Sequence, residues 1–378
     1  MSRTAITSTM LAAVAVALAV TPAAAASATT STTTSTTTST TDGSAAAAGH
    51  PRLHAGWSVA TLLPDGAPSW KGQTLLYISP DGARTAVTTI GRTERLADVS
   101  QDGRYVLSTR SASGGRTEMI VRDLDTGSTR RTPIRAAYED MRLTGGRGDR
   151  VLTQRVTSSD ADGSPDVTEL RRHDGSVVRA LGTGLGVPVT DQGGRFAVAG
   201  SSAGLRRVNL TTGARSRIAA PAGYGQCESR RITSDGHSTG AVTVTCYPTS
   251  GRGTSQVFAI DLDSGKTTLL TPNRAPKGFG WQDAWSQGWA RGIATERLEC
   301  EATVPRRITP DGATAISTGY GWHLQTVDVV GTRIVGLVSS DCGAIARRLV
   351  SHDTRTSTTR TLLSGGAIRT ALVSEYDY

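Results

Sequence analysis

The chain has 378 residues and a formal net charge of +9 at pH 7, and nearly all of its basic residues are arginine. The arginines are scattered over the expected strands and turns, as in "LRRHDGSVVRAL", without a dense basic run. This distribution argues against nucleic acid as a partner. Attraction to an anionic wall or polymer is the alternative that the charge leaves open.

The N-terminal segment has the pattern of a secretory signal peptide, which we predict over residues 1–28. Arg3 precedes an apolar run over 10–20, and small residues over 23–28 offer several cleavage frames. The apolar run is shorter than the roughly 20 residues that an ordinary membrane-spanning helix needs. We therefore expect a secreted or envelope-located protein without a transmembrane helix after cleavage, the alternative being a retained membrane anchor.

A Thr/Ser/Ala-rich segment follows, and the rest of the chain carries the folding information. Residues 29–55 have little apolar surface to bury and are predicted to be a disordered spacer. Residues 56–378 are predicted to form a single domain, in which helix is hard to place anywhere.

Two kinds of β-hairpin alternate along this domain. The first has a turn like Asp-Gly before a strand, as in "VSQDGRYVLS", and the second has an acidic turn, as in "IVRDLDTGSTRRTPI". Copies of the second kind recur at intervals of roughly 40 to 50 residues, which is the repeat length of a four-stranded propeller blade. Asp-Gly favours these hairpins because its glycine tolerates the positive φ of a tight turn.

The repeats predict an all-β fold, a β-propeller of four-stranded blades. A four-stranded sheet alone leaves two apolar faces in water, so the blades must stack around an axis and close. We favour seven blades, with six or eight as alternatives. The first blade lacks an inner pair of strands, which "GWSVATLLP" near the N-terminus and "AIRTALVSEYDY" at the C-terminus supply, so both terminal segments close the ring.

Four cysteines in an exported chain predict two disulfide bonds. Of the three possible pairings, we favour Cys227 with Cys246 and Cys300 with Cys342. The first pair flanks the "TSDGHS" turn almost symmetrically, so its members face each other on antiparallel strands. The second pair ends the second strands of successive blades and would join them. Zinc-ligand spacing is absent, and no cofactor is expected.

The hairpins resemble the TolB-like propeller repeats of exported bacterial proteins. The family consensus is close to S-P-D-G-x-x-hydrophobic, followed by hydrophobic-x-D-x-x-T-G. The matching residues are Asp102, Gly103, Asp123, Thr126 and Gly127, and in a later blade Asp261, Ser264 and Gly265. "SQDG" lacks the usual proline, and Thr211-Thr212 replaces the acidic turn. The resemblance spans most of residues 56–378 and implies an exported propeller, usually with a protein- or ligand-binding role.

Aromatic residues cluster late in the chain. "GFGWQDAWSQGWARG" spaces three tryptophans by four, which roughly keeps them on one face of a strand or a helix, and "TGYGWHLQ" follows nearby. They could form a stacking platform for sugar or peptide, or they could fill the core between blades. The candidate ligand-binding residues are Trp281, Asp283, Trp285, Trp289, Tyr320, Trp322 and His323.

Two further motifs are weaker. "SSDADGSPDVTE" fits the register of a calcium-binding loop, although we favour a plain acidic loop because its first position is serine and flanking helices are absent. The calcium candidates are Asp160, Asp162, Asp166 and Glu169. "GSSAG" at 200–204 formally matches a nucleophile elbow, but we expect a strand rather than the required helix after it.

We therefore interpret the chain as a non-catalytic binding module for an exported protein or a cell-wall polysaccharide. The alternatives are a propeller-based polysaccharide lyase or hydrolase, and an envelope-associated structural protein. An enzyme should bring several acids together with Arg or His in one pocket, whereas a binder should show a flat aromatic or basic patch. Most Asp residues are assigned to turns, so no catalytic residue is assigned.

Overall fold

In the computed structural model, the described residues are 51–374, apart from 114–115, 135–137, 146, 156–166, 202–203, 234–239, 252, 273–279, 287–291, 299–301, 310 and 342–343. The predicted signal peptide and most of the predicted spacer lie outside these residues. The described part of the chain covers most of the predicted domain, 56–378.

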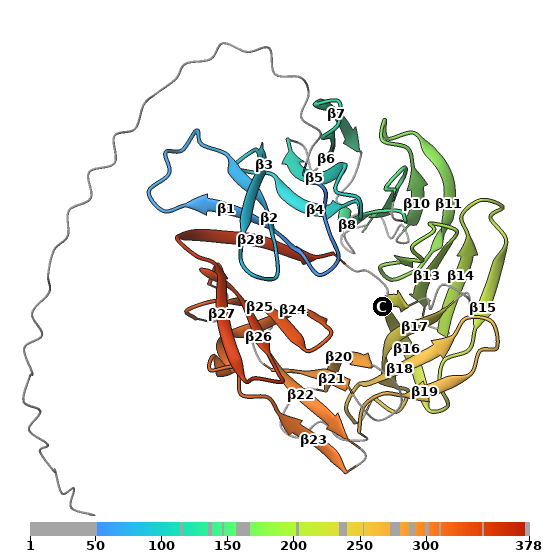
Figure 1. Cartoon of the computed structure of the whole chain (residues 1–378). Helices are drawn as coiled ribbons and strands as arrows, with labels where there is room; N and C mark the ends of the chain where they lie inside the picture. The colour runs from blue at the N-terminus through green and yellow to red at the C-terminus, as the bar shows by residue number, and fades with distance from the viewer. Residues whose placement is uncertain are drawn as a thin grey trace, which may run out of the picture. The chain divides into compact units, whose positions relative to one another are not determined.

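The fold is an all-β propeller of seven blades, which confirms the predicted class and blade number (Figure 1). Each blade is a four-stranded sheet whose neighbouring strands are antiparallel. Among the described residues, helix is limited to one 3-10 turn, η2 (Gly321–His323). No described helix has the length and apolar character needed to cross a bilayer.

The strands of each blade follow one another in the sequence except in the first. From the innermost strand outward, the seven blades are: blade 1, β28 (Gly366–Val373), β1 (Ser58–Pro64), β2 (Gln73–Ile78) and β3 (Arg84–Ile90); blade 2, β4 (Arg95–Val99), β5 (Tyr105–Ala112), β6 (Arg116–Asp123) and β7 (Ser128–Ile134); blade 3, β8 (Tyr138–Leu143), β9 (Val151–Arg155), β10 (Val167–Arg171) and β11 (Val177–Thr183); blade 4, β12 (Val189–Thr190), β13 (Phe196–Ser201), β14 (Gly204–Asn209) and β15 (Arg215–Ile218); blade 5, β16 (Tyr224–Thr233), β17 (Ala241–Pro248), β18 (Gln256–Asp261) and β19 (Thr267–Leu269); blade 6, β20 (Trp281–Ser286), β21 (Gly292–Arg297), β22 (Thr303–Thr309) and β23 (Gly312–Ala315); blade 7, β24 (Leu324–Val330), β25 (Arg333–Val338), β26 (Arg348–Asp353) and β27 (Thr358–Leu363).

The two ends of the domain close the ring within blade 1, as the sequence predicted. β28, from the C-terminal end, pairs antiparallel with β1, from the N-terminal end, and Ser58 lies opposite Val373. The pairing continues past the strand ends, because Gly56 donates its N–H to Ser374 O and Ser374 donates its N–H to Trp57 O. Blade 1 therefore contains its innermost strand only because the two ends of the domain meet.

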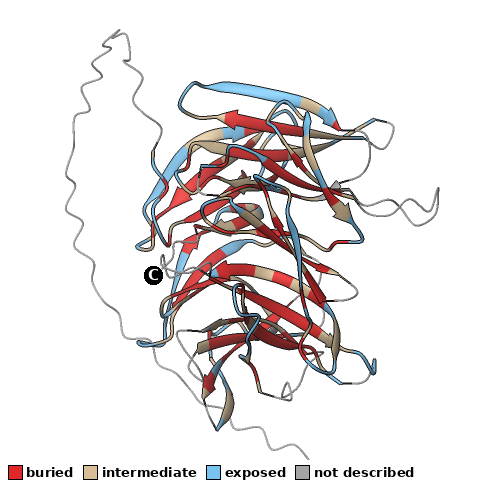
Figure 2. Ribbon diagram, turned by 90° about the vertical axis from the view of Figure 1, so that its right-hand side faces the viewer, coloured by how far each residue is buried: buried red, intermediate tan, exposed pale blue. Residues whose placement is uncertain are grey.

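The hydrophobic core lies between blades. One cluster joins Ala60 of β1 to Val335 of β25, and another joins Val198 of β13 to Val244 of β17. The outermost strands are mostly exposed, as the pale blue edge strands of Figure 2 show. Each blade therefore buries its faces against its neighbours.

The hairpin motifs are explained by the bonds in their turns. Gly103 has φ +77°, and a Cβ there would lie 2.9 Å from Leu53 N, so the turn needs glycine. At the second kind of turn, Asp261 Oδ1 accepts the N–H groups of Asp263 and Ser264. These bonds, the one from Ser264 N–H foremost, lower the pKa of Asp261. Asn209 makes the same two bonds where the acidic turn is replaced, so the motif is structural.

The predicted disulfide between Cys227 and Cys246 is present. The two residues face each other on β16 and β17, with their Cα atoms 4.1 Å apart. Both cysteines are buried. The other predicted pair, Cys300 and Cys342, lies outside the described residues.

We predict that replacing the first pair by Cys227→Ala/Cys246→Ala lowers the free energy of unfolding by about 2 to 5 kcal/mol, because the unfolded chain loses a cross-link. Urea unfolding of the oxidised wild type and the variant measures the difference. Under reductant, the two proteins should have nearly the same free energy of unfolding. The small difference that is left comes from the packing contacts of the two sulfur atoms, which the alanines lack. An equal difference with and without reductant would contradict a stabilising role of the bond.

Candidate functional site

The innermost strands of five blades share a β-bulge followed by a charged residue. A bulge inserts an extra residue into one strand and redirects the side chains that come after it. The register shifts immediately before the charged residue in β4, β8, β16, β20 and β24. The residues at this position are Asp98, Asp140, Arg231, Asp283 and Asp328.

Four of these five residues are aspartates, and three of the aspartates accept a hydrogen bond from the N–H of the residue that follows. Asp98 accepts the N–H of Val99 at 2.8 Å, and Asp283 and Asp328 do the same with their following residues at 2.8 and 2.7 Å. A short acceptor side chain thus satisfies an N–H beside the irregular pairing. Aspartate at this position supports the bulge and also supplies a charge at the centre of the ring.

A charged cluster joins blades 5, 6 and 7. Arg231 forms ion pairs with Asp283 and, at 3.8 Å, with Asp328. Its guanidinium lies 4.2 Å from the centre of the Trp285 ring, and Trp285 Nε1 donates a hydrogen bond of 2.5 Å to Asp328. Burial raises the pKa of Asp328, whereas Arg231 opposes this rise. The cluster therefore holds Arg231 in a fixed position with its charge compensated.

Asp98 links blades 2 and 3. Besides Val99 N–H, its carboxylate accepts the N–H of Leu143 in β8 at 2.8 Å. Burial raises the pKa of Asp98 to about 6, although these two bonds and the Arg142 charge favour the ionised form. This carboxyl group therefore changes its charge within the range of mildly acidic pH.

These charged residues surround a cavity of about 360 Å³ at the centre of the ring. Asp98, Asp140, Arg231 and Asp328 line it, and so do Arg142 and Arg230. Blade 1 and the segment before it contribute apolar residues and one hydroxyl group. These are Leu53, Val59, Leu372, Val373 and Ser374.

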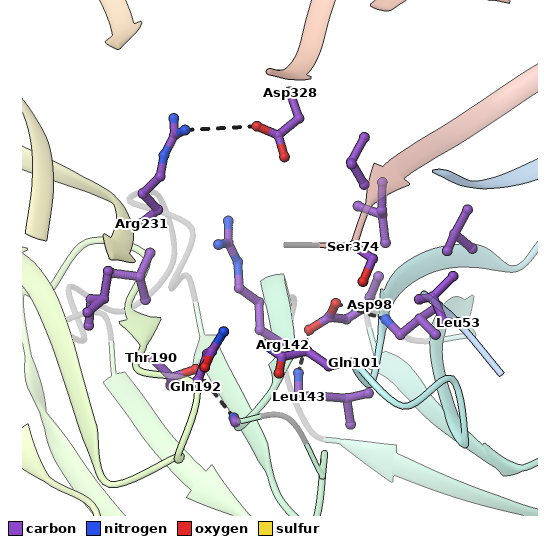
Figure 3. A pocket seen from close by; sticks show the side chains of 18 of the residues that line it. Leu53, Asp98, Gln101, Arg142, Leu143, Thr190, Gln192, Arg231, Asp328 and Ser374 are labelled. Atoms are coloured by element: carbon purple, nitrogen blue, oxygen red, sulfur yellow. Dashed lines mark hydrogen bonds and ion pairs between the residues drawn. The ribbon is translucent and has the colours of Figure 1, made fainter. Parts of the chain in front are cut away.

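The side chain of Arg142 points into this cavity (Figure 3). It is 44% exposed, and its guanidinium lies 3.4 Å from a carboxylate oxygen of Asp140. Arg230 forms a 2.7 Å ion pair with Glu228 and bonds to Thr245. Both of these lining arginines thus have an acidic partner, and Arg142 is the one that Figure 3 shows inside the cavity.

The remaining lining acid stabilises a turn. Asp191, which is 3% exposed, accepts the N–H groups of Arg195 and Phe196, each at 2.7 Å. Three of the lining acids, Asp98, Asp191 and Asp328, are thus bonded to other parts of the protein, whereas Asp140 forms its ion pair with Arg142.

The structure separates the first two tryptophans of the predicted platform. The bulge of β20 lies between Trp281 and Asp283, so Trp281 and Trp285 project from opposite faces of blade 6, although their spacing of four suggested one face. Trp281, which is 1% exposed, packs with Val257 of blade 5, and Trp285 packs with Val329 of blade 7. Trp285 and Asp283 reach the central charged cluster.

The other aromatic candidates lie elsewhere or outside the description. Tyr320 precedes η2 and packs against a third cluster, which includes Leu324, and His323 ends η2. Trp289 and the side chain of Trp322 are outside the described residues. Ligand binding by the seven predicted residues stays a prediction.

The weaker motifs have the following places. Asp160, Asp162 and Asp166 are outside the described residues, and Glu169 of β10 forms an ion pair with Arg171. In the "GSSAG" motif the nucleophile position is Ser202, which is outside the described residues. Ser201 before it ends β13, and its Oγ donates a hydrogen bond to Gly204 O. The next described element is strand β14, which begins at Gly204, and not the helix that a nucleophile elbow requires.

Among the comparisons with known proteins, the one with solved structures found similar proteins. No family model and no curated protein matches it. The β-propeller domain of the Trilobed protease from Pyrococcus furiosus is 12% identical, with a TM-score of 0.55 over 83% of this chain and 97% of that domain. A putative 6-phosphogluconolactonase from Bacteroides uniformis is 13% identical, with a TM-score of 0.52 over 85% of this chain and 100% of that one.

TolB from Acinetobacter baumannii is also among these structures, 16% identical, with a TM-score of 0.46 over 84% of this chain. The chain spans 66% of the length of that TolB chain. Identities this low show the fold alone. The propeller fold agrees with what the TolB-like hairpin motifs imply.

We predict that Asp98 makes stability depend on pH. Its pKa is higher in the folded protein than the usual 3.8, so the folded state binds the proton more tightly than the unfolded state does. Relative to Asp98→Asn, the wild type should lose up to about 3 kcal/mol of unfolding free energy as the pH rises from about 4 to 7. Urea unfolding of both proteins across this range measures the effect, and parallel pH profiles would refute it.

Proposed function

We propose that the chain is an exported binding module, which takes an acidic group of an exported protein into the central cavity. The observation that carries the proposal is the position of Arg142. Its guanidinium extends into the cavity 3.4 Å from Asp140, whereas the other lining acids, Asp98, Asp191 and Asp328, accept bonds from other parts of the protein. An arginine fork pairs well with a carboxylate, particularly where surrounding protein reduces its hydration.

Export is supported by two observations. The N-terminal segment has the composition of a signal peptide, and disulfides such as Cys227–Cys246 persist in oxidising compartments. A secreted or envelope location is therefore part of the proposal. A cell-wall polysaccharide that carries carboxylate groups offers the same chemistry and is a second source of the acidic group.

The binding proposal predicts that Arg142→Gln weakens the capture of carboxylates. The probe is a set of fluorescent tetrapeptides that contain Asp or Glu, each paired with its Asn or Gln counterpart. We expect the wild type to prefer the acidic peptides, and the variant to bind them roughly tenfold less tightly, since one charge-assisted bond contributes about 1.5 to 3 kcal/mol.

The matched control is Arg355→Gln, which removes another exposed charge, in the turn between β26 and β27, and should leave binding unchanged. Equal binding of acidic and amide peptides would overturn the proposal. So would equal weakening by the two variants. A carboxylated polysaccharide that competes with the acidic peptides would identify the second source.

A second candidate is a propeller-based hydrolase or lyase, because several acids and arginines converge in one cavity. Asp98, with its pKa of about 6, has the property expected of a general acid near neutral pH. Solved structures similar in fold include an acylaminoacyl peptidase, a puromycin hydrolase and a putative 6-phosphogluconolactonase, which are 12, 17 and 13% identical to this chain.

If the cavity is catalytic, Asp98→Asn should lower kcat by about 10² to 10⁴, and wild-type kcat should fall as the pH rises above about 6. A panel of polysaccharides, peptides and lactones, assayed for product release, provides the measurement. Turnover that is unchanged by this substitution would rule out Asp98 as the acid.

A further inference from the structure

The outermost strands of the seven blades carry charge of one sign only, which is positive. None of these strands contains Asp or Glu, whereas those of five consecutive blades, 7, 1, 2, 3 and 4, contain arginine. We call these arginines the basic arc. They are Arg360 on β27, Arg84 on β3, Arg130 and Arg131 on β7, Arg179 on β11, and Arg215 and Arg217 on β15.

The basic arc is accessible from solvent. Six of its members are exposed and Arg179 is half-buried. Threonine and serine lie beside the arginines, as in "STRRT" of β7 and "TTRT" of β27, so hydroxyl donors accompany the guanidinium groups. Both kinds of group donate hydrogen bonds to anionic oxygens.

Arginines of the basic arc interact across three of the gaps between its blades. Arg84 donates to Leu362 O of blade 7 at 2.7 Å, and Arg215 of blade 4 donates to Ala180 O of blade 3 at 3.0 Å. Arg360 and Arg130 act electrostatically on Asp81 and Asp174, which lie in turns of blades 1 and 3. The positive charge thus spans the gaps between blades 7 and 1, 2 and 3, and 3 and 4, and acidic turns border it on one side.

We propose that the basic arc binds a linear polymer of repeating phosphate groups that carries no nucleobases. Charges that recur once or twice per blade along a curved edge fit a ligand whose charge also repeats. The planar guanidinium matches phosphate oxygens in a fork geometry, and hydroxyl groups add further bonds. The strands of the arc contain no aromatic residue, so they lack the stacking platform typical of single-stranded nucleic-acid sites.

The competing explanation is protection of exposed sheet edges. Charged side chains on an outermost strand discourage pairing with another molecule. Very short edge strands are protected in another way, and the uncharged outermost strands of blades 5 and 6, "TTL" and "GATA", have only three and four residues. Charge of either sign protects a longer edge equally well, whereas the outermost strands of the arc carry arginine alone. Protection therefore does not account for the single sign of the charge.

The test uses long-chain inorganic polyphosphate as the probe and the full chain as the protein. The arc variant is Arg130→Gln/Arg217→Gln/Arg360→Gln, which removes one charge from each of three blades and keeps the arginines that bond to neighbouring carbonyls. The control variant is Arg147→Gln/Arg150→Gln/Arg355→Gln, which removes three exposed charges from turns outside the arc. Both variants change the net charge equally, and thermal unfolding checks that both are folded.

We expect the wild type to bind polyphosphate with an affinity that falls steeply between about 50 and 200 mM NaCl. The arc variant should bind roughly tenfold or more weakly, and its slope of log affinity against log salt should be smaller by about 2. The control variant should match the wild type.

Three outcomes would overturn the proposal. The first is the absence of binding, and the second is equal weakening in both variants, which would indicate attraction by net charge alone. The third is tighter binding of single-stranded DNA or polyglutamate than of polyphosphate at the same ionic strength. The Arg142 experiment concerns a different residue and a different probe, so either proposal can fail without the other.

Discussion

The pairing of β28 with β1 is the constraint on which the rest of the structure depends. Every blade buries apolar side chains against a neighbour, so a ring that stayed open would leave two blade faces in water. The bonds between these strands remove both open faces at once. Closure also fixes the distances across the centre, where charges from different blades meet.

Arginine contributes to the ring in a way that lysine could not. Arg84, Arg207 and Arg307 each donate to a backbone carbonyl of an adjacent blade, at 2.7 to 2.9 Å. The guanidinium fork directs one N–H into the carbonyl while its other N–H groups remain available for further contacts, and the group stays charged. The excess of arginine in this sequence therefore includes residues that connect blades through their backbones.

The sequence predicted the blades well because turn chemistry is local. The Asp102-Gly103 turn and the symmetric placement of Cys227 and Cys246 specified hairpins whose register the structure confirms. The central cavity was not predicted, because Asp98 and Asp328 were grouped with the turn aspartates and Asp283 was assigned to the aromatic platform. Their distinguishing feature is a position just before a hydrophobic residue inside an inner strand, and bulges there are not evident from alternation. The same bulge turned Trp281 and Trp285 to opposite faces.

The closure also determines how the domain responds to tension on its ends. Ser58 and Val373 are paired at the same end of an antiparallel ladder, so the chain leaves the ring from two neighbouring points. A force that separates these points breaks the hydrogen bonds between β1 and β28 one pair after another. It does not load all of them in shear at the same time. If one end of the domain is tethered to a surface and the other is held by a binding partner, we expect the pairing of β1 with β28 to be the first part of the propeller to open under load.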